Sequence, residues 1–311
     1  LRHSNKTLCS FELLPPLRGD DIESIYAILD PLIEFKPPYI NITYHQEEVV
    51  YKEVQSNLLE RRSIWKRPGT VAISAAIKYR YNITVVPHLI CGGFTREETE
   101  NALIDLHFLG INNILAVRGD PDMESKIFKP EKGGHKYTLD LINQIGNMNK
   151  GIYLDDDLEY TKPTNFSIGV AGYPEKHPES PNMKSDLHFL KKKVEAGADF
   201  IVTQMFFDNS KFFRFVELCR NEGIDVPIIP GIKPITIFEH LQYLPKTFNI
   251  DLPEELVREI LKCKSKEKIR QVGIDWAIEQ SRELVRSEVP VVHYYTMGRP
   301  DNIRKIVEEV F

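Results

Sequence analysis

The sequence is poor in cysteine, and its four cysteines (Cys9, Cys91, Cys219 and Cys263) lie far apart, without a Cys-x-x-Cys pair. This scarcity argues against a structural zinc site and against a disulfide framework, and it predicts a protein of a reducing, cytoplasmic compartment. The N-terminus lacks the apolar core of a signal peptide, and no apolar run reaches membrane-spanning length. We therefore expect a soluble protein with no membrane partner.

The sequence also lacks an excess of either charge, because 40 Lys and Arg residues stand against 45 Asp and Glu residues, a formal net charge of −5. Such a balance gives no electrostatic footprint for nucleic acid, so an anionic ligand must be held by local donors. At 311 residues the chain can bury a large core without metals or disulfides. We expect one catalytic domain over residues 1–311.

What the sequence does contain is a regular alternation of short β-rich runs with longer segments of helical period, which is the pattern of parallel βα units. Runs such as IVTQMFF and VPIIPGI are apolar on both faces, as buried parallel strands are. The predicted strands are 7–14, 39–44, 83–90, 113–117, 166–172, 200–206, 226–230 and 291–295.

Helices are predicted between these strands, for example at 20–35, 95–109 and 184–196. The second of them begins with a capping box, formed by Thr95 and Glu98. Two segments depart from the regular pattern. The polar insertion 151–164 is predicted to be a solvated loop, and 251–286 is predicted to supply extra helix before the last strand.

Eight βα units in one chain predict a closed (β/α)8 barrel, the TIM-barrel architecture of the α/β class, because right-handed crossovers keep wrapping the same way. An open, doubly wound sheet is the alternative. Such a sheet usually carries a glycine-rich turn after its first strand, and the sequence SFELLPP at that place is nothing of the kind.

Polar and aromatic residues gather where the predicted strands end, which is where β/α barrels carry their catalytic groups. Glu12 lies between apolar Phe11 and Leu13, which predicts a raised pKa and suits a general acid; a solvated loop glutamate is the alternative. The other strand-end residues are Thr43, Tyr44, His88, Arg118, Gly119, Asp120, Tyr173, Gln204, Pro230, Gly231, Tyr295 and Arg299.

Structural readings of several of these residues stay open. His88, taken alone, is more often a hydrogen-bonded structural residue than a catalytic one. Arg118 and Asp120 can hold an anion and accept hydrogen bonds, or form a surface ion pair. Gln204, among aromatic residues, suits the edge of a heterocycle. A lysine run such as 191–193 is typical of a solvated helix face.

Taken together, the motifs SFELLPP, NITY, PHLICGG, AVRGDP, VAGYPEKHPES, GADFIVTQMFFD, IIPGIKP and HYYTMGR resemble those of methylenetetrahydrofolate reductases of bacterial, single-domain length. They occur in all eight βα units, in the family's order. The resemblance implies a cytoplasmic flavoprotein of one-carbon metabolism and methionine biosynthesis. It would bind FAD, oxidise NADH or NADPH, and reduce 5,10-methylenetetrahydrofolate to 5-methyltetrahydrofolate by ping-pong hydride transfer. Its ligands would be small molecules, and it would form a homo-oligomer.

The resemblance also implies residue roles. Glu12 matches the general acid that protonates the folate so that its methylene bridge opens to an iminium, and Asp120 matches the carboxylate beside the flavin and the pterin. The positions implied to hold FAD are Thr43, Tyr44, His88, Arg118, Gly119, Asp120, Thr138, Tyr173, His177, Ser180, Asp186, Lys192 and Lys193. The positions implied to hold the substrate are Asp120, Gln204, His240, Tyr295 and Arg299. No metal is implied.

The chain departs from the family pattern at a few places. Phe189 replaces a polar FAD contact, His240 stands where some members have glutamine, and Gly298 replaces the usual asparagine before Arg299. We expect no regulatory domain and no feedback by adenosylmethionine. Two other classes stay open. A lyase or isomerase would need a Schiff-base lysine or a metal cluster, and neither is predicted at the strand ends. A flavin-binding scaffold would tolerate the loss of Glu12.

Overall fold

The computed structural model describes residues 6–46, 48–55, 58–64, 66–120 and 127–311. Eight strands, hydrogen-bonded in the order β1, β10, β9, β8, β7, β6, β5, β2, close into a barrel, which confirms the predicted (β/α)8 fold. Their bounds are β1 Leu8–Leu13, β2 Tyr39–Ile42, β5 Thr84–Ile90, β6 Asn113–Val117, β7 Ser167–Gly172, β8 Ala198–Met205, β9 Ile228–Ile232 and β10 Val291–Tyr295.

The helices are α1 Ile22–Ile33, α2 Thr70–Tyr81, α3 Arg96–Phe108, α4 Thr138–Met148, α5 Met183–Glu195, α6 Asn209–Asn221, α7 His240–Phe248, α8 Glu254–Leu261, α9 Lys266–Arg286 and α10 Pro300–Val310. The capping box of α3 is confirmed, because Glu98 N donates to Thr95 Oγ1 at 3.2 Å and Thr95 N donates to Glu98 Oε2 at 2.8 Å. Helices α8 and α9 are the predicted extra helix, and 151–164 is a loop. None of the described helices has both the length and the apolar character needed to cross a membrane.

The chain forms two compact units. Unit 1 comprises residues 1–13, 28–40 and 167–311, and unit 2 comprises residues 14–27 and 41–166. Each contains parts of the barrel wall, so the boundary cuts through the strand order rather than following a linker. The prediction of one catalytic domain stays a prediction.

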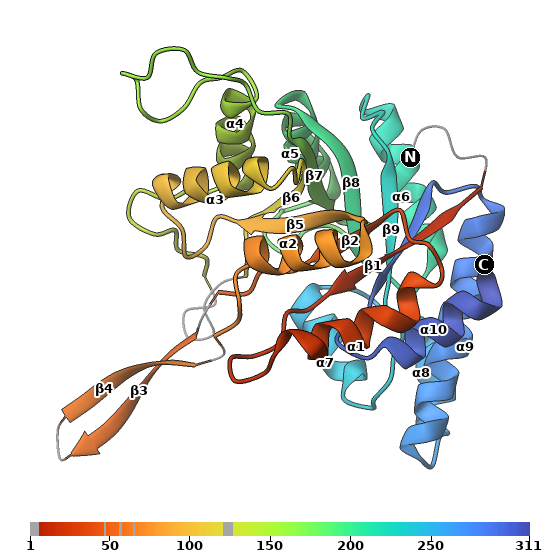
Figure 1. Cartoon of the computed structure of the whole chain (residues 1–311). Helices are drawn as coiled ribbons and strands as arrows, with labels where there is room; N and C mark the ends of the chain where they lie inside the picture. Colours follow the sequence, from red (N-terminus) through yellow and green to blue (C-terminus); the bar gives the residue numbers. More distant parts are fainter. Residues whose placement is uncertain (1–5, 47, 56–57, 65, 121–126) are drawn as a thin grey trace. The chain divides into compact units, whose positions relative to one another are not determined.

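In unit 1, α9 lies beside α8 and α10 (Figure 1). An apolar cluster that includes Met205 of β8, Leu244 of α7 and Ile260 of α8 joins α7, α8 and α9 to the ends of the strands. Gly273 of α9 allows an unusually close approach, because a Cβ atom there would lie 1.7 Å from the carbonyl oxygen of Ile235. The segment that follows β9 is therefore held tightly against α9.

Unit 2 contains a feature that the sequence did not predict, a two-stranded antiparallel sheet of β3 Glu48–Gln55 and β4 Leu58–Ile64. In Figure 1 this hairpin (orange) extends away from α2 and α3 of the same unit. Its apolar side chains Tyr51, Val54 and Leu59 are exposed. These three side chains therefore lie outside the apolar core of the unit.

Candidate active site

The carboxyl end of β1 brings Glu12 beside two polar residues of unit 1. The Cα register pairs Glu12 of β1 with Tyr295 of β10. Strands β10 and β9 are in register at Tyr294 and Ile232, so the next residues, Tyr295 and Lys233, are neighbours as well. A row of Glu12, Tyr295 and Lys233 thus crosses three strands at the end where β/α barrels carry their catalytic groups. We call it the Glu12 row.

Glu12 itself is largely enclosed. Its side chain is 14% exposed. Its chain neighbours Phe11 and Leu13 are buried, but in a strand they point to the opposite face, so the apolar surroundings of Glu12 stay a prediction. The end of β1 is fixed by Thr296, whose hydroxyl donates to the carbonyl oxygen of Glu12 at 2.7 Å. The raised pKa of Glu12 stays a prediction.

A histidine that the sequence analysis did not single out lies beneath the Glu12 row. His293 is fully buried, and its Nδ1 lies 2.8 Å from the hydroxyl of Ser10. Its Nε2 lies 3.8 Å from Glu12 Oε2 and has no hydrogen-bond partner among the described residues. The ring stacks on Tyr39, with 6.3 Å between ring centroids, and meets the ring of Tyr295 edge-on. The imidazole is therefore held with one nitrogen toward the carboxyl group of Glu12.

Tyr295 is fixed by a close approach between β8 and β9. Its hydroxyl donates to the carbonyl oxygen of Thr203 at 2.6 Å. A Cβ atom on Gly231 would lie 2.5 Å from that same oxygen and 2.6 Å from the hydroxyl of Tyr295, so only glycine leaves the tyrosine its place. Burial, and next the carboxylate of Glu12, raises the pKa of Tyr295, which keeps the phenol a hydrogen-bond donor.

Gly231→Ala tests this close approach. The added methyl group must displace either the ring of Tyr295 or the backbone of Thr203, so we expect the free energy of unfolding to fall by about 1–3 kcal/mol, as overpacking usually costs. Urea unfolding followed by circular dichroism measures the change. An unaltered transition midpoint would mean that the ring of Tyr295 does not occupy this space.

The sequence analysis predicted no lysine at a strand end, and this prediction is wrong for Lys233. Strand β9 continues to Ile232 instead of ending at Pro230, so Lys233 follows it directly. The residue is only 6% exposed. Burial lowers the pKa of its ammonium group to about 8, against the opposing influence of the Glu12 carboxylate. An ammonium group therefore lies inside the site, within electrostatic reach of Glu12.

Two residues predicted to bind substrate lie near this lysine. His240 is the first residue of α7, and burial, followed by the charge of Lys233, lowers its pKa to about 4. Arg299, which is exposed and precedes α10, acts on His240 in the same direction. His240 is thus an uncharged imidazole at neutral pH, in a region where the other two side chains are cations.

Tyr173 and Gln204, two further predicted residues, line a small depression of unit 1 together with Met205 and Phe248. Oε1 of Gln204 accepts a hydrogen bond of 2.9 Å from the backbone N–H of Met205. The amide nitrogen is consequently the end of Gln204 that can donate to a ligand. The structure brings these two residues together, as expected for side chains that follow β7 and β8.

The loop after β7, which carries Tyr173 and His177, is held by Asp186 in the first turn of α5. Asp186 accepts hydrogen bonds from His177 N at 3.0 Å and from the hydroxyl of Ser180 at 2.9 Å, one on each carboxylate oxygen. The ring of His177 meets that of Tyr173 edge-on, with 4.7 Å between centroids. Asp186 therefore positions the loop, a role that the sequence analysis did not separate from direct binding.

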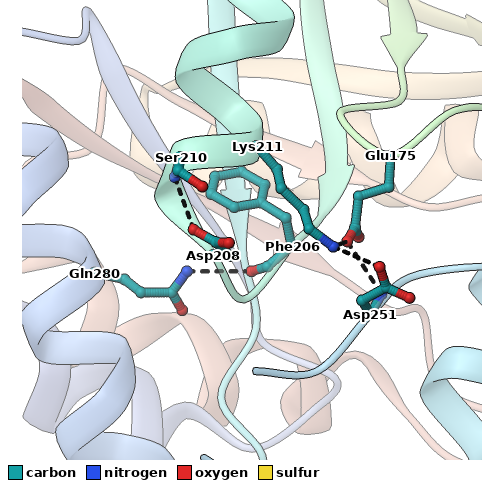
Figure 2. A network of polar contacts seen from close by, with 7 residues as sticks. All are labelled: Glu175, Phe206, Asp208, Ser210, Lys211, Asp251 and Gln280. Carbon is teal, nitrogen blue, oxygen red and sulfur yellow. Dashed lines mark hydrogen bonds and ion pairs between the residues drawn. The ribbon is translucent and has the colours of Figure 1, made fainter. Parts of the chain in front are cut away.

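A second set of polar contacts holds the same loop through Glu175 (Figure 2). Lys211, in the first turn of α6, binds Glu175 of the loop and Asp251, the latter at 2.6 Å. The backbone N–H of Asp251 also donates to Glu175 at 3.1 Å. The loop is thus connected both to α6 and to the segment before α8.

The predicted residues of α5 lie at its two ends. Asp186 is in the first turn, whereas Lys192 and Lys193 are in the last. Asp186, Phe189 and Lys193 share one face of the helix, because residues three and seven positions further on lie on the same side. Phe189, the departure from the family pattern, is 54% exposed on that face.

Unit 2 brings together residues of β2 and β5 and the segment that follows β6. His88 is buried, and its Nε2 lies 3.4 Å from the amide nitrogen of Asn41. The carbonyl oxygen of Arg118 accepts hydrogen bonds from Cys91 N at 3.1 Å and Gly92 N at 3.2 Å. These bonds tie the loop after His88 to the Arg118 segment.

The side chains around this loop offer aromatic surface, and one glycine of the Arg118 segment has a left-handed backbone conformation. The guanidinium group of Arg118 lies 5.0 Å from the centre of the Phe128 ring. Gly119 has a φ of 86°, a conformation that favours glycine. Tyr44 packs against Phe94, with 5.0 Å between ring centroids. Of the remaining predicted residues of unit 2, Thr43 is buried, Thr138 is the first residue of α4 and half-buried, and Asp120 is exposed. Pro121, the last residue of the AVRGDP motif, lies outside the described residues.

The predicted residues thus form two groups, one in each unit. Within the described part of the chain, no group of three or more His, Cys, Asp or Glu side chains is arranged to hold a metal ion. The residues that the sequence analysis missed, His293 and Lys233, both belong to the group around Glu12. For His293 the alternation of side chains along β10 was the available signal, since it lies two residues before Tyr295 and shares its face of the strand.

Comparison with known proteins places the chain in a family. A family model described as methylenetetrahydrofolate reductase matches residues 1–310. Methylenetetrahydrofolate reductase 2 of Saccharomyces cerevisiae is 33% identical over 300 residues, which cover 95% of this chain and 45% of the yeast protein. The 5,10-methylenetetrahydrofolate reductase of Salmonella typhimurium is 31% identical over 294 residues, which cover 94% of this chain and 86% of the bacterial protein. The chain spans less than half the length of the yeast relative and of a plant relative from Arabidopsis thaliana.

Similarity in structure supports the fold. A solved structure of an uncharacterized protein from Clostridium thermocellum, which binds two copies of 5-methyl-5,6,7,8-tetrahydrofolic acid, is similar with a TM-score of 0.56 at 12% identity. The match covers 98% of this chain and 94% of that one. At this identity the likeness concerns the barrel alone. Sequence and fold agree, and the chain belongs to the methylenetetrahydrofolate reductase family.

Proposed function

We propose that the protein reduces 5,10-methylenetetrahydrofolate to 5-methyltetrahydrofolate, with FAD as cofactor and NADH or NADPH as electron donor, the donor and the folate reacting in turn. The observation that carries this proposal is the enclosed carboxyl group of Glu12 at the end of β1, in a row with Tyr295 and Lys233, in a chain of this family. The similar protein that binds 5-methyltetrahydrofolic acid on the same fold agrees with a folate ligand.

Taken by itself, each unit contains side chains of the kinds that bind a flavin dinucleotide. Such a ligand needs aromatic or apolar surface for its rings, hydrogen-bond partners for its polar edges, and cations for its diphosphate. Unit 2 supplies Tyr44, Arg118 and the buried side-chain oxygen Oδ1 of Asn41, which has no partner among the described residues. Unit 1 supplies Tyr173 and the half-buried Lys193. FAD, when bound, supplies the hydride that the folate accepts.

The residues of the chain supply the proton chemistry and the orientation. Glu12 gives its proton to the folate, which opens the methylene bridge to an iminium ready for reduction. His293, fixed by Ser10, limits where the carboxyl group of Glu12 can lie. Gln204 donates through its amide nitrogen to the ligand that occupies the depression beside Tyr173. Their enclosed position excludes water from the reacting atoms, which strengthens each of these interactions.

The colour of the purified protein tests the proposal. We expect a yellow protein that loses its colour under anaerobic conditions with NADH or NADPH and regains it when 5,10-methylenetetrahydrofolate is added. Stopped-flow reduction with each nicotinamide in turn identifies the donor. A protein that is bleached but does not regain its colour with the folate would be a flavin-binding scaffold or an enzyme for another acceptor.

Asp120→Asn is expected to raise the reduction potential of the bound flavin. A carboxylate about 4 Å from an anionic reduced flavin costs about 4 kcal/mol at an effective dielectric constant near 20. That cost corresponds to about 90 mV for a two-electron couple. Asp120 is exposed, so solvent screening lowers the expected shift to a few tens of mV. Spectroscopic titration against a reference dye measures the potential, with Asp157→Asn as the control, and an unchanged potential in Asp120→Asn would remove this role.

A further inference from the structure

Lys233 is a cation in a place where a structural residue would be apolar. The other residues of β9 with large side chains, Ile228, Ile229 and Ile232, are all buried hydrophobic residues. Lys233 follows them and is 6% exposed, so its ammonium group has given up most of its water. Burial of such a charge is unfavourable unless a nearby group of opposite charge compensates for it. The position therefore calls for a functional explanation.

The charged and titratable groups around Lys233 come from several elements. On β1 and β10, Glu12 and Tyr295 lie in its own row, and His293 lies beneath that row. From α7, His240 lies close enough for Lys233 to lower its pKa, and Arg299 influences the same imidazole. Glu239, which precedes α7, acts on His240 in the opposite direction. The carboxylate of Glu12 is the charge that opposes the effect of burial on Lys233. Glu12 and Lys233 are therefore electrostatic partners across the row.

We propose that Lys233 is a positioning residue of the folate half-reaction, whose ammonium group stabilises the carboxylate that Glu12 becomes when it releases its proton. The inference rests on the proposed function. Glu12 first takes up a proton from solvent. In the step its O–H bond breaks, the proton goes to the folate amine, and the electron pair stays on the carboxylate oxygen. The ammonium group keeps its own proton throughout. Fixed charge aimed at a position where opposite charge develops is among the largest contributions that a protein makes to catalysis.

Lys233→Met keeps the length and apolar part of the side chain and removes its charge. We expect this variant to slow the reoxidation of reduced flavin by 5,10-methylenetetrahydrofolate by about 10²-fold, the usual loss for one stabilising donor. Flavin reduction by the nicotinamide should keep its wild-type rate. Lys262→Met, which removes a lysine that is 62% exposed and paired with Glu259, is the matched control and should change neither rate.

The pH profile of the folate half-reaction separates this role from a structural one. In the wild-type protein the rate should fall as Lys233 loses its proton, near pH 8. Lys233→Arg keeps the charge at every accessible pH, so this fall should move to higher pH or vanish. The proposal is wrong if Lys233→Met slows both half-reactions equally, or if the alkaline fall is the same in the wild type and in Lys233→Arg.

A measurement without cofactor or substrate distinguishes failure of this inference from failure of the proposed function. The pKa of Lys233 can be followed by NMR of ¹³C-labelled lysine in the unliganded protein. Glu12→Gln removes the carboxylate that favours the ammonium form, so the pKa of Lys233 should fall further below that of an ordinary lysine. An unchanged pKa overturns the pairing. If the wild-type flavin is not reoxidised by the folate, the proposed function fails, and this titration alone decides whether the pair exists.

Discussion

Replacing Glu12 by glutamine is expected to slow the reoxidation of the flavin by 5,10-methylenetetrahydrofolate by about 10²–10⁴-fold, the range that positioned general acids contribute. Glutamine has nearly the same size and can keep the contacts of the site, but it has no acidic proton for the folate. Reduction of the flavin by the nicotinamide transfers no proton from Glu12 and should keep its rate. Anaerobic stopped-flow spectroscopy measures the two half-reactions separately.

Another buried glutamate provides a control for the loss of a carboxylate as such. Glu100 of α3 is 7% exposed, and it accepts a hydrogen bond from the backbone of Leu154. Glu100→Gln should change the stability of the protein but leave the ratio of the two half-reactions unaltered. If Glu12→Gln lowered both rates by the same factor, as a structural variant would, Glu12 would hold the barrel together and would not be the acid.

The barrel could be predicted from the sequence because its strands are apolar on both faces and alternate with helices. The β3–β4 hairpin could not, because it has neither property. Lys52 of β3 faces Glu60 of β4, so this pair of strands lacks a continuous apolar run. The hairpin also lies between β2 and α2. It therefore interrupts one of the βα units that the alternation of strands and helices predicts. A hairpin that packs on no core leaves little trace in hydrophobic periodicity.

The strand-end rule identified Glu12, Gln204 and Tyr295, since each comes last or next to last in its strand. It missed His293, which lies inside β10 and becomes part of the site only through a partner 283 positions away, Ser10. Such a pairing depends on the register of two strands from opposite ends of the chain. Hydrophobic patterns locate strands, but they do not give the register between strands so distant in sequence.

Lys233 was missed for a different reason. The predicted strand ends at 230, and Pro230 and Gly231 are residues that weaken strands. In the structure β9 continues through them, and Gly231 N donates to the hydroxyl of Thr203 at 3.0 Å rather than leaving the sheet unpaired. The strand end therefore moves by two residues, from Pro230 to Ile232, and a lysine that had looked like part of a loop becomes part of the Glu12 row.

Lys211→Met is expected to destabilise the protein by about 2–3 kcal/mol at neutral pH, somewhat less than the loss of a fully buried ion pair, because Lys211 is partly exposed. Its partner Glu175 has a side chain that is only 9% exposed, and one of its oxygens, Oε2, has no hydrogen-bond partner among the described residues. Without Lys211 this carboxylate keeps the hydrogen bond from the backbone N–H of Asp251, and the nearby charge is the like charge of the Asp251 side chain. Urea unfolding of the variant and the wild type measures the difference.

The pH dependence of that difference identifies its cause. Burial raises the pKa of Glu175 in the folded protein, and Lys211 opposes this rise, so the pKa should rise further in Lys211→Met. A carboxyl group with a raised folded pKa destabilises the protein only where it is ionised. The loss in Lys211→Met should therefore be small near pH 4 and larger at pH 7, because it grows between the unfolded and the folded pKa of Glu175 as that group ionises. Adding Glu175→Gln to the variant should recover most of the lost stability, because the buried charge is gone. A loss of equal size at pH 4 and pH 7 would show that Lys211 acts through packing, and the loop that carries Tyr173 and His177 would then not depend on this ion pair.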